Sequence, residues 1–179
     1  MLLPEILTYI GIFILTYGLW SAFSGRHKTK ELCFLSGTMT LALSASINYI
    51  FSGSLEVFAF VLLFLLQAAA NLLEIFSKMG RVNTIIIASI SIFLFSLFFL
   101  SGLLYKNYFF VISVGTMFAA FGYKEKPANL VRQNILLMMA AFFESAFAFL
   151  TNQYIYIVLN IPFIFFAVLK VSKARLGTN

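Results

Sequence analysis

The sequence predicts an all-α integral membrane protein with seven transmembrane helices, arranged as 3+1+3 parallel triple-helix repeats. Three observations lead to this fold class. Of the 179 residues, 62% are apolar and only 10% are charged, against about 25% charged in an ordinary soluble domain. The apolar residues form continuous runs, most of them near the roughly 20 residues that a membrane-spanning helix needs. The basic residues gather in alternate polar breaks, as the positive-inside rule expects.

Other fold classes fit this composition poorly. A soluble domain of this length cannot bury so large an apolar fraction, because small domains leave much of their surface exposed. A disordered chain or a disulfide-stapled module is excluded by the apolar content and by the single cysteine, Cys33. A membrane β-barrel is excluded because its strands alternate apolar and polar residues, whereas these runs are continuous.

Polar breaks set the boundaries of the predicted helices in chain order. The first run ends at a basic loop, the second and sixth end at short uncharged turns, and the third and seventh end at a Ser-Lys pair. Gly115 and Pro162 lie in the fifth and seventh runs, which are the short ones. The predicted helices cover 2–23, 32–51, 55–77, 83–104, 108–122, 132–150 and 154–171. They form one membrane domain, 1–179, with a first three-helix repeat (1–80), a linker helix (81–106) and a second three-helix repeat (107–179).

The distribution of positive charge predicts the orientation. With seven spans, one side of the membrane receives 11 of the 12 basic residues, and the other side receives Lys106 alone. Basic loops are retained on the cytoplasmic side. The sequence therefore predicts a multi-pass protein with the N-terminus outside and the C-terminus in the cytoplasm.

The first three and last three predicted helices share a layout. Ala119-Ala120-Phe121 precedes a basic loop 98 residues after Ser21-Ala22-Phe23 does the same. The same offset pairs Ala42 with Ala140 and brings the two short outer turns to within a residue of each other. Both triplets start outside, so we interpret them as parallel repeats, a plan that many transporters use with the ligand site between the halves.

In size, seven spans, outside N-terminus and 3+1+3 layout, the chain resembles the SWEET and PQ-loop superfamily. Its short charged loop, Phe23-Ser24-Gly25-Arg26-His27-Lys28, resembles that of the small bacterial inner-membrane proteins of the YgjV type. The resemblance implies the plasma (inner) membrane of a prokaryote. The chain departs from the SWEET pattern of hinge prolines, because its three prolines are Pro4, Pro127 and Pro162, and it has no Pro-Gln pair.

Polar residues inside predicted spans are the candidate site, because polar groups in lipid usually face protein or a water-filled cavity. Ser46 and Asn48 lie within about two helical turns of the outer boundary, and Glu144 and Asn160 lie at a similar depth. The offset of 98 residues aligns Ser46 with Glu144. The sequence therefore predicts a polar chamber in the outer half of the membrane.

Glu144 is the only acidic residue well inside a span. An isolated carboxylate there costs at least a few kcal/mol. Two interpretations stay open: a proton or cation site, or a neutral carboxyl group that holds helices together by a hydrogen bond to Asn48 or Asn160.

A second polar group lies on the third predicted helix. Gln67, Asn71 and Glu74 share one face through their i, i+4, i+7 spacing. They could line an inner vestibule or form interhelical hydrogen bonds, with Glu74 paired to Lys78. On the second predicted helix, a stripe that includes Gly37 and Ser44 favours close helix packing.

The leading hypothesis for function is a small-solute membrane transporter or facilitator. The expected substrate-binding residues are Glu144, Asn48, Ser46, Asn160, Gln67 and Asn71. The alternative is a non-transport assembly partner or receptor whose intramembrane polar residues are structural. No catalytic pair, metal-ligand set or cofactor motif is present in the sequence, so we expect no enzyme, no metal and no cofactor. The expected partners are the lipid bilayer and a small-molecule or ion substrate, with no nucleic acid; a homo-oligomer stays open.

Overall fold

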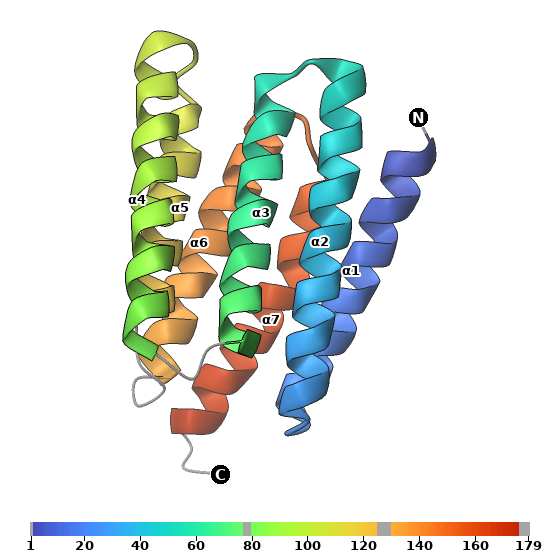
Figure 1. Cartoon of the computed structure of the whole chain (residues 1–179), viewed down its shortest axis with the longest axis vertical. Coiled ribbons are helices and arrows are strands. Elements are labelled where there is room, and N and C mark those ends of the chain that lie inside the picture. The colour runs from blue at the N-terminus through green and yellow to red at the C-terminus, as the bar shows by residue number, and fades with distance from the viewer. Residues whose placement is uncertain (1, 77–79, 125–129, 176–179) are drawn as a thin grey trace. The chain divides into compact units, whose positions relative to one another are not determined.

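The computed structural model describes residues 2–76, 80–124 and 130–175, and every regular element in them is an α-helix (Figure 1). The helices are α1 (Leu2–Phe23), α2 (His27–Ser52), α3 (Leu55–Phe76), α4 (Gly80–Leu104), α5 (Phe109–Lys124), α6 (Leu130–Leu150) and α7 (Ile155–Arg175). The predicted all-α chain of seven helices is confirmed for these residues.

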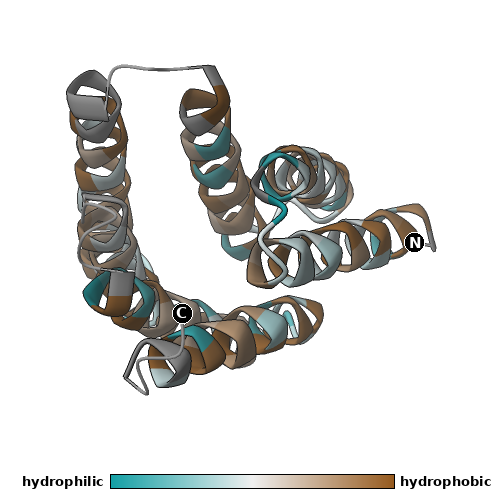
Figure 2. Cartoon of the chain, turned by 90° about the horizontal axis from the view of Figure 1, so that it is seen from below, coloured by the Kyte–Doolittle hydropathy of each residue, from teal (hydrophilic) through white to brown (hydrophobic). Residues whose placement is uncertain are grey.

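Six of the described helices are long and apolar enough to cross a membrane, by length and composition alone, and hydrophobic residues recur along the helices with hydrophilic ones among them (Figure 2). α5 differs, because its apolar stretch Phe109–Gly122 is shorter. The 16 residues of α5 reach only about 24 Å at 1.5 Å per residue, against a hydrocarbon core of about 30 Å. The fold is therefore that of an all-α membrane protein, and α5 stays a predicted span.

α2 begins five residues earlier than predicted, at His27 rather than at residue 32. Gly25 has a φ of 78°, and the Arg26 N–H donates to the Ser21 carbonyl oxygen at 2.9 Å, so α1 ends and the chain reverses within three residues. The first turns of α2 then include Lys28 and Lys30. The predicted basic loop is therefore partly a basic helix end.

Two left-handed residues end the helices at the predicted outer turns. Gly53 has a φ of 61°, and its N–H donates to the Tyr49 carbonyl oxygen at 2.8 Å. Asn152 has a φ of 59° at the end of α6. Glycine and asparagine are the residues that most readily take this conformation, so the prediction of two tight hairpin turns is confirmed.

The chain divides into two compact units, Met1–Asn83 (unit 1) and Thr84–Asn179 (unit 2). In unit 1, α2 packs against both α1 and α3; in unit 2, α6 packs against both α5 and α7. The N-terminus of unit 1 lies at the same end as its α2–α3 turn, and in unit 2 the α4–α5 and α6–α7 turns share one end (Figure 1). The finer predicted division into two repeats and a linker stays a prediction.

Glycines bring α1 against α2 and α5 against α6. A Cβ on Gly11 would lie 3.2 Å from the Gly37 carbonyl oxygen, and a Cβ on Gly18 only 2.9 Å from the Cys33 Cβ. Gly115 and Gly122 of α5 have the same spacing of seven residues. A Cβ on Gly115 would lie 3.5 Å from the Ala140 carbonyl oxygen, so small residues allow close backbone approach in both units.

These contacts give an internal register that differs from the one predicted. Gly37 and Ala140, which make equivalent contacts, are 103 residues apart rather than 98. The reason is helix length: α2 has 26 residues and α6 has 21, so the two helices match at 103 when counted from their starts and at 98 when counted from their ends. At the offset of 103 residues, which follows the helix contacts, the residue of α2 that corresponds to Glu144 is Leu41. At the offset of 98 residues it is Ser46, which matches Glu144 only in its distance from the turn after the helix.

Candidate functional site

Glu144 lies on α6 with 7% of its surface exposed. It precedes the last residue of the helix by six positions, which places it about 9 Å from the α6–α7 turn. The buried residues on either side of it around the helix are apolar: Ala140, Ala141, Phe147 and Ala148. The structure therefore places this carboxyl group in the middle of the buried face of α6.

α5 approaches α6 beside this residue. A Cβ on Gly115 would lie 3.2 Å from the Phe143 Cβ and 3.7 Å from the Glu144 backbone nitrogen. The rings of Phe143 and Phe118 stack with centroids 5.6 Å apart. Phe109 reaches the next turn of α6, with its ring centroid 5.5 Å from that of Phe147. The surroundings of Glu144 on this side are thus aromatic and closely packed, with nothing charged among these contacts.

Asn160 lies on α7 and is 4% exposed. It is five residues into the helix, so it lies about 8 Å from the same turn. α6 and α7 pack against each other, and this depth is close to that of Glu144. The predicted common depth of Glu144 and Asn160 therefore holds within unit 2.

The two buried polar groups are not joined to each other. Within the described residues of unit 2, neither Glu144 nor Asn160 has a side-chain hydrogen bond or an ion pair. The neighbouring Ser145 behaves differently, since its hydroxyl donates to the Ala141 carbonyl oxygen of its own helix at 2.8 Å. The predicted bond between Glu144 and Asn160 is therefore absent, and the predicted bond to Asn48 stays a prediction.

Pro162 lies inside α7, two residues after Asn160. A proline has no N–H and cannot donate to the carbonyl group four residues earlier, which here belongs to Val158. One backbone acceptor of α7 is therefore left without its helical donor in the turn that holds Asn160. A carboxyl group, a primary amide and a carbonyl oxygen are groups that can hold a proton or a hard cation.

The candidate residues of α2 behave as helix-surface polar groups. Ser46 is half-buried, and its hydroxyl donates to the Ala42 carbonyl oxygen at 2.7 Å. Asn48 is also half-buried. Both lie in unit 1, whereas Glu144 and Asn160 lie in unit 2, and the chamber predicted between them stays a prediction.

On α3, the structure gives one of the two predicted roles to Asn71. Its Nδ2 donates to the Oγ1 of Thr38 on α2 at 3.4 Å, an interhelical hydrogen bond. Gln67 lies one turn earlier on the same face and is half-buried. The side chain of Glu74 and its predicted partner Lys78 lie outside the described residues.

A polar contact that the sequence did not predict joins α1 to α2. The hydroxyl oxygens of Thr8 and Ser44 lie 2.7 Å apart, and both lie within hydrogen-bond distance of the Pro4 carbonyl oxygen, at 2.9 and 2.5 Å. Ser44 belonged to the stripe for which packing was predicted, and this contact fits that role. The sequence did not single out Thr8 as an interhelical contact, because a threonine inside a helix can equally bond to the backbone of its own helix.

Two further findings concern metal ligands and known relatives. Over the part of the chain that the structure describes, no three His, Cys, Asp or Glu side chains come together as metal ligands. Comparison of the chain with protein-family models, with curated proteins and with solved structures gives no match.

Proposed function

We propose that the chain is a small-solute membrane transporter or facilitator with a polar chamber between two three-helix halves. The observation that carries this proposal is Glu144, a carboxyl group 93% buried in a helix that can span a membrane. It has no hydrogen-bond or ion-pair partner in the described part of its unit. A buried charged group without a partner is costly, and a ligand that supplies positive charge would offset that cost.

The substrate-binding residues proposed are Glu144 and Asn160, with Ser46, Asn48, Gln67 and Asn71 from unit 1. Glu144 would carry a proton or hold a cationic group of the solute. Asn160, at nearly the same depth, would bind a polar group beside it. The aromatic residues next to Glu144 can add cation–π attraction to a cationic ligand.

The repeated packing of the two units supports the transport proposal. In each unit the middle helix of a triplet packs against both of its neighbours, and a glycine pair spaced by seven residues lies at the first of these two contacts. We propose that α1–α3 and α5–α7 are parallel repeats that rock against each other, with α4 as the linker. A relationship to the SWEET and PQ-loop superfamily belongs to this proposal.

The location belongs to the same proposal. With the charge split described above, we place the chain in the plasma membrane of a prokaryote, with the N-terminus outside and the C-terminus in the cytoplasm. Glu144 would then lie in the outer half of the membrane.

A non-transport role, as an assembly partner or receptor, is the second candidate. The observations that favour it are the hydrogen bonds of Asn71 with Thr38 and of Thr8 with Ser44. In these places intramembrane polar groups connect neighbouring helices, as a structural role requires. Glu144 and Asn160 show no such bond to each other, so transport is the better-supported function.

Transport assays in proteoliposomes test the proposal. Vesicles that contain the purified protein and an internal pH dye would receive sugars, amino acids and small organic cations in turn, with and without a pH gradient. We expect at least one class to enter faster than in protein-free vesicles, and Glu144→Gln to abolish its pH dependence. Ser145→Ala is the matched control, because Ser145 is bonded only to its own helix. No protein-dependent flux for any class, or full pH dependence in Glu144→Gln, would contradict the proposed role.

A further inference from the structure

The turn that joins α1 to α2 is basic. It carries Arg26, Lys28 and Lys30, with Glu31 as the nearby acid. The side chains of Arg26 and Lys28 are exposed, and neither forms an ion pair with a carboxylate of the described residues. Their positive charge is therefore available to an external anion.

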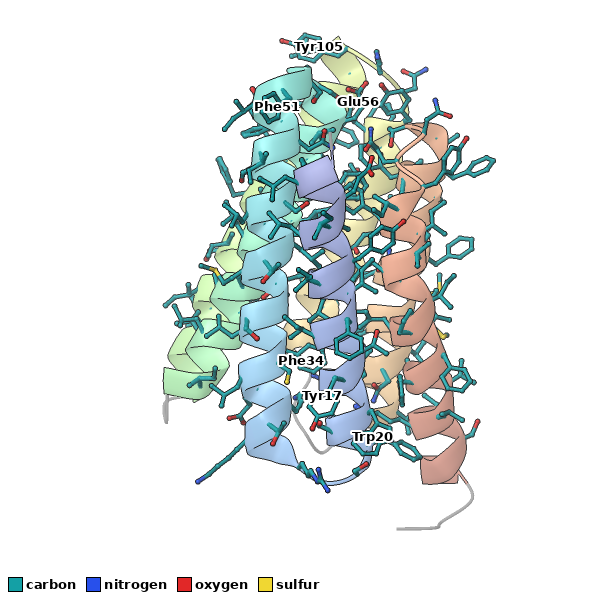
Figure 3. All side chains as sticks on the ribbon, turned by 90° about the vertical axis from the view of Figure 1, so that its right-hand side faces the viewer. Tyr17, Trp20, Phe34, Phe51, Glu56 and Tyr105 are labelled. Atoms are coloured by element: carbon teal, nitrogen blue, oxygen red, sulfur yellow. The ribbon has the colours of Figure 1, made fainter. Side chains whose placement is uncertain are left out.

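Two of these cations lie over aromatic rings of α1 and α2. The Arg26 Cζ lies 5.8 Å from the centroid of the Trp20 ring, and the Lys30 Nζ lies 5.6 Å from that of Phe34. Trp20 lies three residues before the end of α1, and Phe34 lies seven residues after the start of α2 (Figure 3). The two cations thus lie beside aromatic rings near the helix ends, an arrangement typical of basic side chains that reach the headgroup level of a membrane.

An exposed apolar face runs along α1 from the same place. Tyr17 and Trp20 are 42% and 47% exposed, and their rings lie 5.9 Å apart. Four more exposed apolar residues continue this face at intervals of three and four residues: Leu3, Ile6, Ile10 and Phe13. We call these six residues the α1 strip.

We propose that the basic turn and the α1 strip together form a binding site for an anionic phospholipid. Arg26 and Lys28 would bind the headgroup phosphate, Tyr17 and Trp20 would lie at the glycerol level, and an acyl chain would follow the rest of the α1 strip. Arginine suits this role, because its guanidinium can stack on an indole and still donate hydrogen bonds to a phosphate from its edge. This site is separate from the proposed transport site and does not depend on it.

The strip is what distinguishes a lipid from a soluble phosphate as the occupant. A free anion would use only the basic turn, and the exposed aromatic residues below it would contribute nothing. Tyr and Trp are enriched where apolar and polar layers of a membrane meet. Basic residues next to a membrane helix attract anionic lipids by about 1 kcal/mol each, which is about a fivefold preference.

Trp20 makes the site directly observable, because it is the only tryptophan in the chain. Bromine atoms on an acyl chain quench indole fluorescence on contact. The protein would be reconstituted into phosphatidylcholine vesicles in which brominated phosphatidylglycerol or brominated phosphatidylcholine replaces part of the lipid. We expect brominated phosphatidylglycerol to quench Trp20 with a relative binding constant about 25-fold higher, about fivefold for each of Arg26 and Lys28.

Variants localise the preference. Arg26→Gln should reduce the ratio of the two binding constants about fivefold. The double variant Arg26→Gln/Lys28→Gln should reduce the ratio further. Lys106→Gln is the matched control, since Lys106 also lies over an aromatic ring, with its Nζ 5.4 Å from the centroid of Tyr108, in the other unit. It should leave the ratio unchanged.

The comparison in the unsubstituted protein decides the proposal even if a variant does not fold. Equal quenching by the two brominated lipids would overturn it. Inorganic phosphate added to the protein in neutral detergent separates the two sources of phosphate. A change in Trp20 fluorescence at millimolar phosphate, together with equal lipid quenching, would show a site for a soluble anion and would also overturn the lipid assignment.

Discussion

At the residue scale, Glu144 has a side chain whose removal should not weaken the fold. Its neighbours around α6 are apolar, and no partner in the described part of unit 2 is bonded to it. Replacing an unpaired buried polar group by an apolar group of similar size is close to neutral or stabilising. We therefore expect Glu144→Leu to keep or raise the midpoint of thermal unfolding in detergent while it abolishes transport. A loss of about 1–2 kcal/mol, the scale of a membrane hydrogen bond, would instead reveal a structural partner.

Asn71 should show the opposite behaviour, because its Nδ2 donates to Thr38 across α2 and α3. The distance of 3.4 Å is long, so a coupling energy near the average of about 0.6 kcal/mol for hydrogen bonds within membranes is expected. A double-mutant cycle with Asn71→Leu and the isosteric Thr38→Val, followed by unfolding in detergent mixtures, measures this coupling. Additive effects of the two substitutions would exclude the bond as a stabilising contact.

Residue types alone did not reveal which polar groups are paired. Asn71 and Asn160 are both amides within apolar helices, yet one bonds across helices and the other has no described partner in its unit. The difference lies in the register between neighbouring helices, which depends on helix length and on where glycines permit contact. The five-residue difference between α2 and α6 is enough to change which residue of α2 matches Glu144.

At the scale of elements, Gly11 at the contact between α1 and α2 has less room for a side chain than Gly115 at the contact between α5 and α6. A Cβ on Gly11 would lie 2.8 Å from the Leu41 Cγ and 3.2 Å from a backbone oxygen, whereas the closest atom to a Cβ on Gly115 is 3.2 Å away. We expect Gly11→Ala to destabilise by about 1–3 kcal/mol, the usual range for overpacking, and Gly115→Ala by clearly less. Urea unfolding of both variants in the same detergent tests this order, and equal losses would contradict it.

The elements themselves could be predicted well from the sequence because lipid offers a spanning backbone few alternatives to the helix. Polar breaks located the ends of most helices to within a few residues. The start of α2 could not be located in this way, because the charged residues from Lys28 to Glu31 suggested a loop. In the structure these residues lie on the first turns of a helix, where the Lys30 N–H donates to the Arg26 carbonyl oxygen at 3.1 Å.

At the scale of the whole molecule, the charge distribution predicts which turns face the outside. In a background with Cys33→Ala, single cysteines at Ser52 or Asn152, both exposed, should react with a membrane-impermeant maleimide from outside the cell. Cysteines at His27 or Ala128 should react only after permeabilisation. Ala128 lies outside the described residues, and His27 is the first residue of α2. Reaction of all four positions from one side would refute the seven-span topology.

The short α5 has a consequence for the membrane itself. A helix about 6 Å shorter than the hydrocarbon core creates a hydrophobic mismatch, which the surrounding bilayer relieves by thinning, at a fraction of a kcal/mol for each ångström. If α5 spans, lipids with shorter acyl chains lower that cost, and the protein should unfold at a higher temperature in them than in long-chain lipids. The acyl-chain length of the host membrane would then change the stability of the protein through one helix of 16 residues. The protein would be most stable in membranes thinner than average.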